Sequence, residues 1–202
     1  MSAALDALRR RYDGREPGLV GARREYAVLC PVMDLPDGPH LLFEVRAAHL
    51  RQGGEVCFPG GKKEAGESFI DCALRETEEE LSIPRCEIQL LGTPDFLCNS
   101  GGFLLRPVLG LVSKAGLAAI SPSASEVSEV FTVPLSFFQT TAPEVYAYDL
   151  LPRVQEDFPY ARVGISQDYP WSRGRVEVPV WYWQGHVIWG MTARIIRRLI
   201  AE

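Results

Sequence analysis

The chain has 202 residues, of which 47% are hydrophobic and 23% charged, and its formal net charge is −5. This length and composition predict one globular domain with a substantial core. The negative charge argues against general nucleic-acid binding, which needs a basic surface, and the sequence has no apolar run of membrane length.

Cysteine usage points to a reducing compartment. The chain has five cysteines, an odd number, and they form no C-x-x-C pair. They therefore indicate reduced thiols and no zinc site, and we expect a cytoplasmic location.

The N-terminal part of the chain predicts a helix followed by a β-hairpin. Residues 3–12 have an amphipathic helical pattern that Asp13-Gly14 and Pro17-Gly18 break, so residues 1–22 are expected to form an N-terminal helical extension. Apolar residues 26–32 and 41–45 flank a Pro-Asp-Gly-Pro turn, which predicts two antiparallel strands.

Residues 58–83, FPGGKKEAGESFIDCALRETEEELSI, predict a glycine-rich turn and then a helix carrying the acidic residues from Glu67 to Glu80. Glu76, Glu79 and Glu80 stand at positions i, i+3 and i+4, so their carboxylates share one helix face beside an apolar stripe. Like charges at this spacing destabilise an isolated helix by about 0.2–0.5 kcal/mol per pair. A hard divalent cation, Mg2+ or Mn2+, would explain the crowding. The alternative is a solvated acidic face.

Two neighbouring features favour the cation site. Arg75 directly precedes Glu76, and Glu67 lies eight residues before Arg75, where it can brace the guanidinium group across two turns. Gly60 and Gly61 remove side chains from the expected helix entrance, where backbone N–H groups can bind an anion.

The next part of the chain predicts further strands. They are expected at residues 87–94, at 103–112 with an interruption at Pro107, and at 126–135, before a short helix at 136–139.

The C-terminal part begins with residues 141–175, which have no clean period and are expected to form a loop-rich insertion around a hairpin, suited to a lid or pocket wall. A closing hairpin at 176–183 and 187–189 and an amphipathic helix at 191–200 follow. Trp181, Trp183 and Trp189 are expected in the core or on a sheet face rather than as a platform for adenine.

The spacing of the acidic segment resembles the signature of the Nudix hydrolases. That signature asks for a glycine, a glutamate and an Arg-Glu-aliphatic-any-Glu-Glu-any-Gly-aliphatic run, which Gly61, Glu67 and residues 75–83 match at every charged position. Thr77 replaces the aliphatic residue and should pack through its methyl group. Ser82 replaces the closing glycine and must end the helix without glycine's easy access to positive φ. The resemblance implies an α/β (α+β) fold, a Nudix-type mixed β-sheet sandwiched between helices, in a single domain over residues 1–202.

The segment before this box resembles the additional motif of the coenzyme A pyrophosphatase branch of the family. The matching residues are Arg46, Ala47, Arg51, Gly54 and Phe58-Pro59-Gly60-Gly61. The sequence departs from the motif by one residue fewer between Arg51 and Gly54 and by Glu44, where the branch usually has threonine.

The branch resemblance implies a small-molecule substrate, coenzyme A or its acyl derivatives, cleaved to 3′,5′-ADP and (acyl-)4′-phosphopantetheine. Arg46 and Arg51 are candidate phosphate contacts because guanidinium groups bind phosphate through planar, multidentate hydrogen bonds. Surface ion pairing is the alternative for both. Phe58, Gly60 and Gly61 complete the expected substrate-binding set.

The family resemblance also implies attack by a metal-activated water, with Mg2+ or Mn2+ held by Glu76, Glu79 and Glu80. Glu79 or Glu126 would accept the proton, and Arg75 and Glu67 would hold the helix and loop in place. The sequence leaves open whether Glu126 is an ordinary loop carboxylate, which glutamate is the base, and which metal, form of coenzyme A and oligomeric state apply.

Two other functions are compatible with the box. A Nudix hydrolase of ADP-ribose or another nucleoside diphosphate derivative would share every box residue and differ in its pocket. A non-catalytic nucleotide-binding Nudix module would typically lack box carboxylates, and this chain retains them all.

Overall fold

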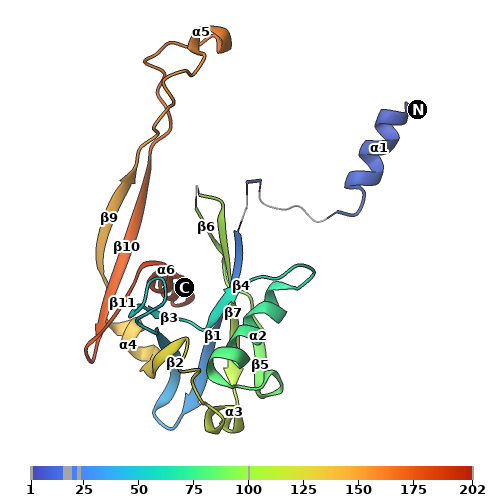
Figure 1. The fold of residues 1–202 in the computed structure, drawn as a ribbon. Coiled ribbons are helices and arrows are strands. Elements are labelled where there is room, and N and C mark those ends of the chain that lie inside the picture. The colour runs from blue at the N-terminus through green and yellow to red at the C-terminus, as the bar shows by residue number, and fades with distance from the viewer. Residues whose placement is uncertain (1, 16–19, 22–23, 100, 202) are drawn as a thin grey trace.

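The computed structural model describes residues 2–15, 20–21, 24–99 and 101–201 (Figure 1). Pro17-Gly18, the second expected break after the N-terminal helix, lies outside the described residues. Helix α1 (Ala3–Tyr12) has the expected bounds and buries none of its residues. None of the described helices is long and apolar enough to cross a membrane.

A mixed eight-stranded sheet forms the centre of the molecule. Its main path runs in the order β3-β2-β1-β7-β5, while β4 pairs with β1, β6 with β7 and β8 with β2. The strands are β1 (Arg24–Leu35), β2 (Gly38–Arg46), β3 (Val56–Cys57), β4 (Gly60–Lys62), β5 (Ile88–Gly92), β6 (Leu97–Cys98), β7 (Phe103–Val112) and β8 (Val127–Pro134). The predicted hairpin is confirmed, since β1 and β2 pair in antiparallel register with Val32 opposite Leu41.

The remaining elements cover this sheet or extend from it. The helices are α2 (Phe69–Leu81), the 3-10 turn η1 (Arg85–Glu87), α3 (Lys114–Ala118), α4 (Leu135–Thr140), α5 (Tyr160–Val163) and α6 (Gly190–Leu199). A second sheet has the order β11-β10-β9 and comprises β9 (Glu144–Leu150), β10 (Gly174–Trp183) and β11 (His186–Trp189).

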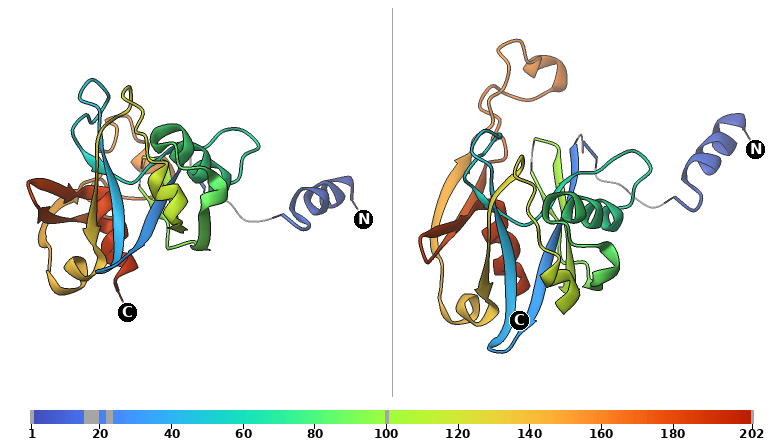
Figure 2. Two further views of the ribbon diagram at one scale, coloured as in Figure 1. Left: turned by 90° about the horizontal axis from the view of Figure 1, so that it is seen from below. Right: turned by 60° about the horizontal axis from the view of Figure 1, so that its bottom comes forward.

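Alternation along β1 sends side chains into two separate cores. Ala27 and Leu29 lie in the core beneath α2, whereas Cys30 lies in the core that contains Phe138 of α4 and Ile196 of α6. Figure 2 shows α2 and α6 on opposite sides of β1 and β2. The expected mixed sheet between helices is therefore confirmed.

Strand β7 continues through Pro107, so the predicted interruption is wrong. Pro107 pairs with Val28 of β1 in the parallel ladder. On the other edge of β7, β6 covers Leu104 and Leu105, and β5 begins its pairing at Leu109. The ladder thus has a gap beside Pro107, where none of the described strands requires the N–H group that proline lacks.

The expected insertion at residues 141–175 contains one strand of a long hairpin. Strands β9 and β10 pair from Glu144 opposite Val180 to Leu150 opposite Gly174, and α5 lies in the connection between them. Figure 1 shows this connection projecting away from the central sheet.

The predicted closing hairpin of β10 and β11 is also present, and the three tryptophans lie on its strands. Trp181 is buried and donates to the Thr141 carbonyl at 2.7 Å, and Trp183 packs on Phe137. Trp189, in contrast, is exposed on β11.

Candidate active site

Helix α2, which carries the acidic residues, is capped at both ends. The Ser68 Oγ accepts a hydrogen bond from the Asp71 N–H at 3.0 Å, which satisfies one of the free donors of the first turn. Ser82 ends the helix in the left-handed region with φ 59° and ψ 24°, and its Oγ donates to the Ser121 carbonyl at 2.9 Å. The prediction that Ser82 takes glycine's role at the C-terminus is confirmed. Thr77 is fully buried, as expected.

The helix begins at Phe69, so two expectations about its entrance are wrong. Glu67 precedes the helix, and Gly60 and Gly61 belong to β4, which pairs with β1. A Cβ atom on Gly60 would lie 2.3 Å from the Ala27 carbonyl oxygen, and one on Gly61 would lie 2.4 Å from the Glu76 carboxylate carbon. Glycine is required here by close approach to the sheet and to Glu76, not by an anion at a helix N-terminus.

The three box carboxylates differ strongly in exposure. The side chain of Glu76 is 16% exposed and that of Glu79 is 56% exposed, whereas Glu80 is buried. Glu76 and Glu80 are four residues apart and lie toward the sheet, because the helix buries Thr77 and Leu81 beside them. Glu79 lies at the exposed edge of the same surface.

Glu80 is held by the backbone of β4. The Gly60 N–H donates to its Oε2 at 2.7 Å. Burial raises the pKa of Glu80 above its ordinary value of 4.5, the nearby charge of Glu44 raises it further, and the Gly60 hydrogen bond opposes both.

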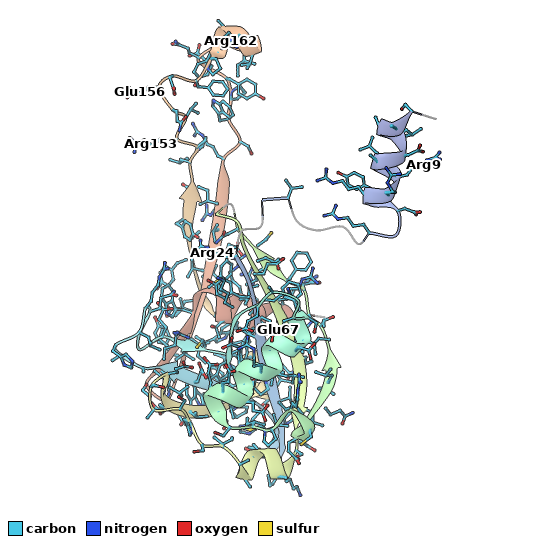
Figure 3. The ribbon with its side chains drawn as sticks, turned by 45° about the vertical axis from the view of Figure 1, so that its right-hand side comes forward. Arg9, Arg24, Glu67, Arg153, Glu156 and Arg162 are labelled. Atoms are coloured by element: carbon cyan, nitrogen blue, oxygen red, sulfur yellow. The ribbon has the colours of Figure 1, made fainter. Side chains whose placement is uncertain are left out.

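Arg75 connects the remaining carboxylates. Its Nε donates to Glu67 Oε1 at 2.9 Å, and its Nη1 lies 2.8 Å from Glu76 Oε1 and 3.0 Å from Glu79 Oε2. The Arg75 hydrogen bond lowers the pKa of Glu67 to about 2, whereas burial raises that of Glu76 against the effect of Arg75. Figure 3 labels Glu67 beside α2. The predicted contact between Glu67 and Arg75 is therefore present.

Glu44 joins this group from β2, although it is not among the site residues predicted from the sequence. The residue is fully buried, and its Oε1 accepts a hydrogen bond from the Cys57 thiol at 3.3 Å. Burial raises the pKa of Glu44, as do the charges of Glu126 and Glu76. Its spacing could have identified it, because Glu44 lies two residues before Arg46 on one strand and both side chains are therefore on the same face of the sheet.

The expected substrate-binding residues occupy different environments. Arg46 is half-buried at the end of β2, and its charge acts on Glu44 and Cys57. Arg51 is exposed in the turn that follows β2. Phe58, in contrast, is buried in the core and stacks on Phe43 with ring centroids 4.9 Å apart, so its place in the structure is that of a packing residue.

Glu126 is exposed immediately before β8. Its backbone carbonyl accepts from the Ala47 N–H at 2.8 Å, which joins the start of β8 to the end of β2. Its charge raises the pKa of Glu44, Glu76 and Glu80, so the side chain lies within electrostatic range of all three.

The chemistry of this group fits a divalent cation. Its donors are carboxylate oxygens, which Mg2+ and Mn2+ prefer, and one buried oxygen, Glu44 Oε2, has no hydrogen-bond partner among the described residues. Within those same residues, no three His, Cys, Asp or Glu side chains are already gathered as a coordination shell. In particular, Glu79 contacts Arg75. Cation binding would therefore require side-chain movement, including that of Glu79 away from Arg75.

Two surface cavities lie elsewhere. One of about 470 Å³ is lined by residues that include Thr93, Leu109 and Arg198. Another of about 420 Å³ is lined by residues that include Phe69, Phe96 and Arg106. Neither is lined by a box carboxylate, so the site rests on the arrangement of the charged groups.

Comparison with known proteins identifies the family. The profile of the NUDIX domain matches residues 23–136. The chain belongs to the Nudix hydrolase family. Two relatives carry the name "Uncharacterized Nudix hydrolase NudL". The protein from Photorhabdus laumondii is 38% identical over 182 residues, covering 89% of this chain and 84% of the relative. That from Yersinia enterocolitica is 35% identical over 196 residues, covering 93% and 86%.

A solved structure agrees with the fold of this Nudix hydrolase. The crystal structure of a Nudix hydrolase from M. smegmatis, RenU, is 21% identical and has a TM-score of 0.50, covering 57% of this chain and 73% of that one. Membership of this family makes the chain a hydrolase acting on phosphoanhydride bonds of a nucleoside diphosphate derivative, and the family generally needs divalent metal ions.

Proposed function

We propose that this Nudix hydrolase cleaves coenzyme A or its acyl derivatives to 3′,5′-ADP and (acyl-)4′-phosphopantetheine. The observation that carries the proposal is the position of Arg46. It ends β2 on the face that carries Glu44, close enough for its charge to act on that buried carboxylate. A guanidinium group in this position is suited to contact a phosphate group of the substrate.

The loop after Arg46 supports this reading. The Gly54 N–H donates to the Arg46 carbonyl at 2.9 Å, and the Arg46 N–H donates to the Glu55 carbonyl at 3.0 Å. These bonds close the turn that carries Arg51 and return the chain to β3 and the glycines of β4. Arg46 and Arg51 are therefore presented from one short, closed turn, and we assign both to the phosphate groups of the substrate.

We assign Glu76, Glu79 and Glu80 to the cation, Mg2+ or Mn2+. When bound, the cation would lower the pKa of a water molecule and stabilise negative charge on phosphate oxygens. Glu79 and Glu126 are both exposed, so either can receive the proton. Arg75 and Glu67 position Glu76 and the loop before α2 through their hydrogen bonds.

The first test is cleavage by the purified protein. Coenzyme A, ADP-ribose and a dinucleoside polyphosphate would each be incubated with Mg2+, Mn2+ or chelator, and the products identified by mass spectrometry. We expect metal-dependent release of 3′,5′-ADP from coenzyme A. Cleavage of ADP-ribose alone would retain the metal site and refute the substrate assignment. Binding without cleavage of any compound would support a nucleotide-binding module.

Single-residue variants test the metal assignment. Glu79→Gln and Glu80→Gln should abolish turnover while preserving the fold, because the glutamine amide oxygen at position 80 can still accept from Gly60. Glu78→Gln is the matched control, since Glu78 is exposed on the same helix. Turnover by either site variant at the rate of the control would count against the assignment.

We also propose that the enzyme works in the cytoplasm. All five cysteines are free thiols, and Cys30 and Cys72 are buried. Such thiols are stable in a reducing compartment.

A further inference from the structure

Glu44 is a buried carboxylate that is not part of the Nudix box. It lies on β2, which is an interior strand of the central sheet because it pairs with β8 along one edge and with β1 and β3 along the other. Glu44 lies opposite Cys57 in β3 and opposite Val130 in β8. Both backbone neighbours hold it in place, so its position is determined by the sheet.

Only one of the two Glu44 carboxylate oxygens has a hydrogen-bond partner in the part of the chain that the structure describes. Oε1 accepts from the Cys57 thiol at 3.3 Å, a weak donor, and Oε2 has no partner among the described residues. No lysine, arginine or histidine that the structure describes forms an ion pair with it, although the Arg46 charge acts on it. A buried carboxylate with a free oxygen is costly unless a cation or further donors complete its environment.

The neighbours of Glu44 indicate which kind of group would bind its unpartnered oxygen. Glu44 and Glu80 both contact the segment from Cys57 to Gly60, one through the Cys57 thiol and the other through the Gly60 N–H. Glu76 and Glu126 lie within electrostatic range of Glu44 as well. Four carboxylates from α2, β2 and the start of β8 therefore lie within electrostatic range of one another, and their mutual repulsion favours a positive charge near them.

We propose that Glu44 contributes a fourth carboxylate to the divalent-cation site, with its free Oε2 directed to the hydrated cation held by Glu76 and Glu80. This inference rests on the metal dependence of the proposed function. It adds to the site a residue from the central sheet, at a position where the coenzyme A branch usually has threonine. The site would thereby gain one negative charge and bind Mg2+ or Mn2+ more tightly.

The alternative is that Glu44 acts only through Cys57 as a packing residue. The two roles differ in what an uncharged side chain of the same shape would change. A packing role leaves cation binding unchanged in Glu44→Gln, because the amide oxygen can still accept from the Cys57 thiol. A role in the cation site weakens cation binding, while the metal-free protein stays equally or more stable because a repelling charge is removed.

The experiment measures Mn2+ binding to metal-stripped wild type, Glu44→Gln and Glu78→Gln by electron paramagnetic resonance of free Mn2+. Thermal unfolding is recorded with and without Mn2+. We expect Glu44→Gln to weaken Mn2+ binding about tenfold or more and to reduce the rise in Tm that Mn2+ produces. Glu78→Gln removes the same charge from an exposed position and should behave as wild type.

Unchanged Mn2+ affinity in Glu44→Gln would overturn the proposal, whatever the stability of the metal-free variant. Should Glu44→Gln fail to fold, Glu44→Thr carries the same prediction with a smaller neutral residue. Cleavage of coenzyme A by the wild type is assayed separately. If Glu44→Gln binds Mn2+ more weakly but the wild type does not cleave coenzyme A, the proposed substrate is rejected and the cation site is retained. If the wild type cleaves coenzyme A but Glu44→Gln binds Mn2+ unchanged, the role of Glu44 is rejected.

Discussion

Arg75 binds both carboxylate oxygens of Glu67, with 2.9 Å between Nε and Oε1 and 3.2 Å between Nη2 and Oε2. The third nitrogen of the guanidinium group, Nη1, remains free for Glu76 and Glu79. Glu67 also accepts from the Glu64 N–H at 3.0 Å. One planar cation thus joins the loop before α2 to two of the box carboxylates.

Replacing Arg75 by lysine should therefore impair the enzyme although the charge is kept. An ammonium group cannot contact Glu67, Glu76 and Glu79 at once. We expect a loss of about 1 kcal/mol, equivalent to a fall in Tm of about 2–4 °C, and a fall in turnover of about tenfold or more. Thermal unfolding and steady-state kinetics measure both.

Arg85→Lys is the matched control for this change. Arg85 pairs with Asp71 at 2.9 Å, but both side chains are more than half exposed. An exposed pair is worth little, so the control should change the free energy of unfolding by less than about 0.5 kcal/mol. Equal effects of the two substitutions would show that the planar guanidinium group of Arg75 has no special role.

The Glu67 contact also predicts a loss of stability in acid. The ordinary pKa of 4.5 is lowered to about 2 in the folded protein, so between these values the unfolded chain binds more protons. The stabilisation is present above pH 4.5 and is lost as the pH falls towards 2. Urea unfolding from pH 6 to pH 2 should show a steeper loss for wild type than for Glu67→Gln. If wild type and Glu67→Gln lost stability equally over this pH range, the lowered pKa of Glu67 would be contradicted.

Two adjacent glycines should respond differently to alanine. Gly60→Ala places a methyl group against the backbone of Ala27 and Val28, at a residue with φ 152°, and should cost more than about 2 kcal/mol of stability. Gly61→Ala meets the end of the Glu76 side chain, which can move, so stability should change less while turnover falls about tenfold or more.

Thermal unfolding and kinetics of the two glycine variants check these outcomes. If Gly61→Ala kept full turnover, the position of the Glu76 carboxylate would not matter for catalysis. If Gly60→Ala kept wild-type stability, β4 would not approach β1 as closely as described.

The C-terminus of α2 gives a prediction about backbone strain. Ser82 has φ 59°, so Ser82→Gly should be more stable than Ser82→Ala by about 1 kcal/mol. Both variants lose the hydrogen bond to Ser121, which isolates the backbone effect. The midpoints of urea unfolding measure the difference, and equal midpoints would mean that residue 82 is not left-handed in solution.

The sequence by itself determined the local features of this protein. The apolar period defines the body of α2, the turn at residues 36–39 defines the first hairpin, and the spacing from Glu67 to Glu80 identifies the Nudix box. Each of these depends on residues that are close along the chain, where the geometry of a helix or a tight turn relates position directly to direction. The contact between Glu67 and Arg75 was also predicted, although Glu67 reaches Arg75 from the loop before α2 and not across two turns of the helix.

The tertiary structure decided which of these groups meet. Glu79 and Glu80 are neighbours in sequence, yet only Glu80 is buried against Gly60, because β4 packs beside β1 on that side of the helix. Glu44 lies more than 30 residues before Glu80, and only the pairing of β2 with β3 brings it to the same region. Burial and charge proximity depend on the packing of distant segments, which periodicity along the chain does not encode.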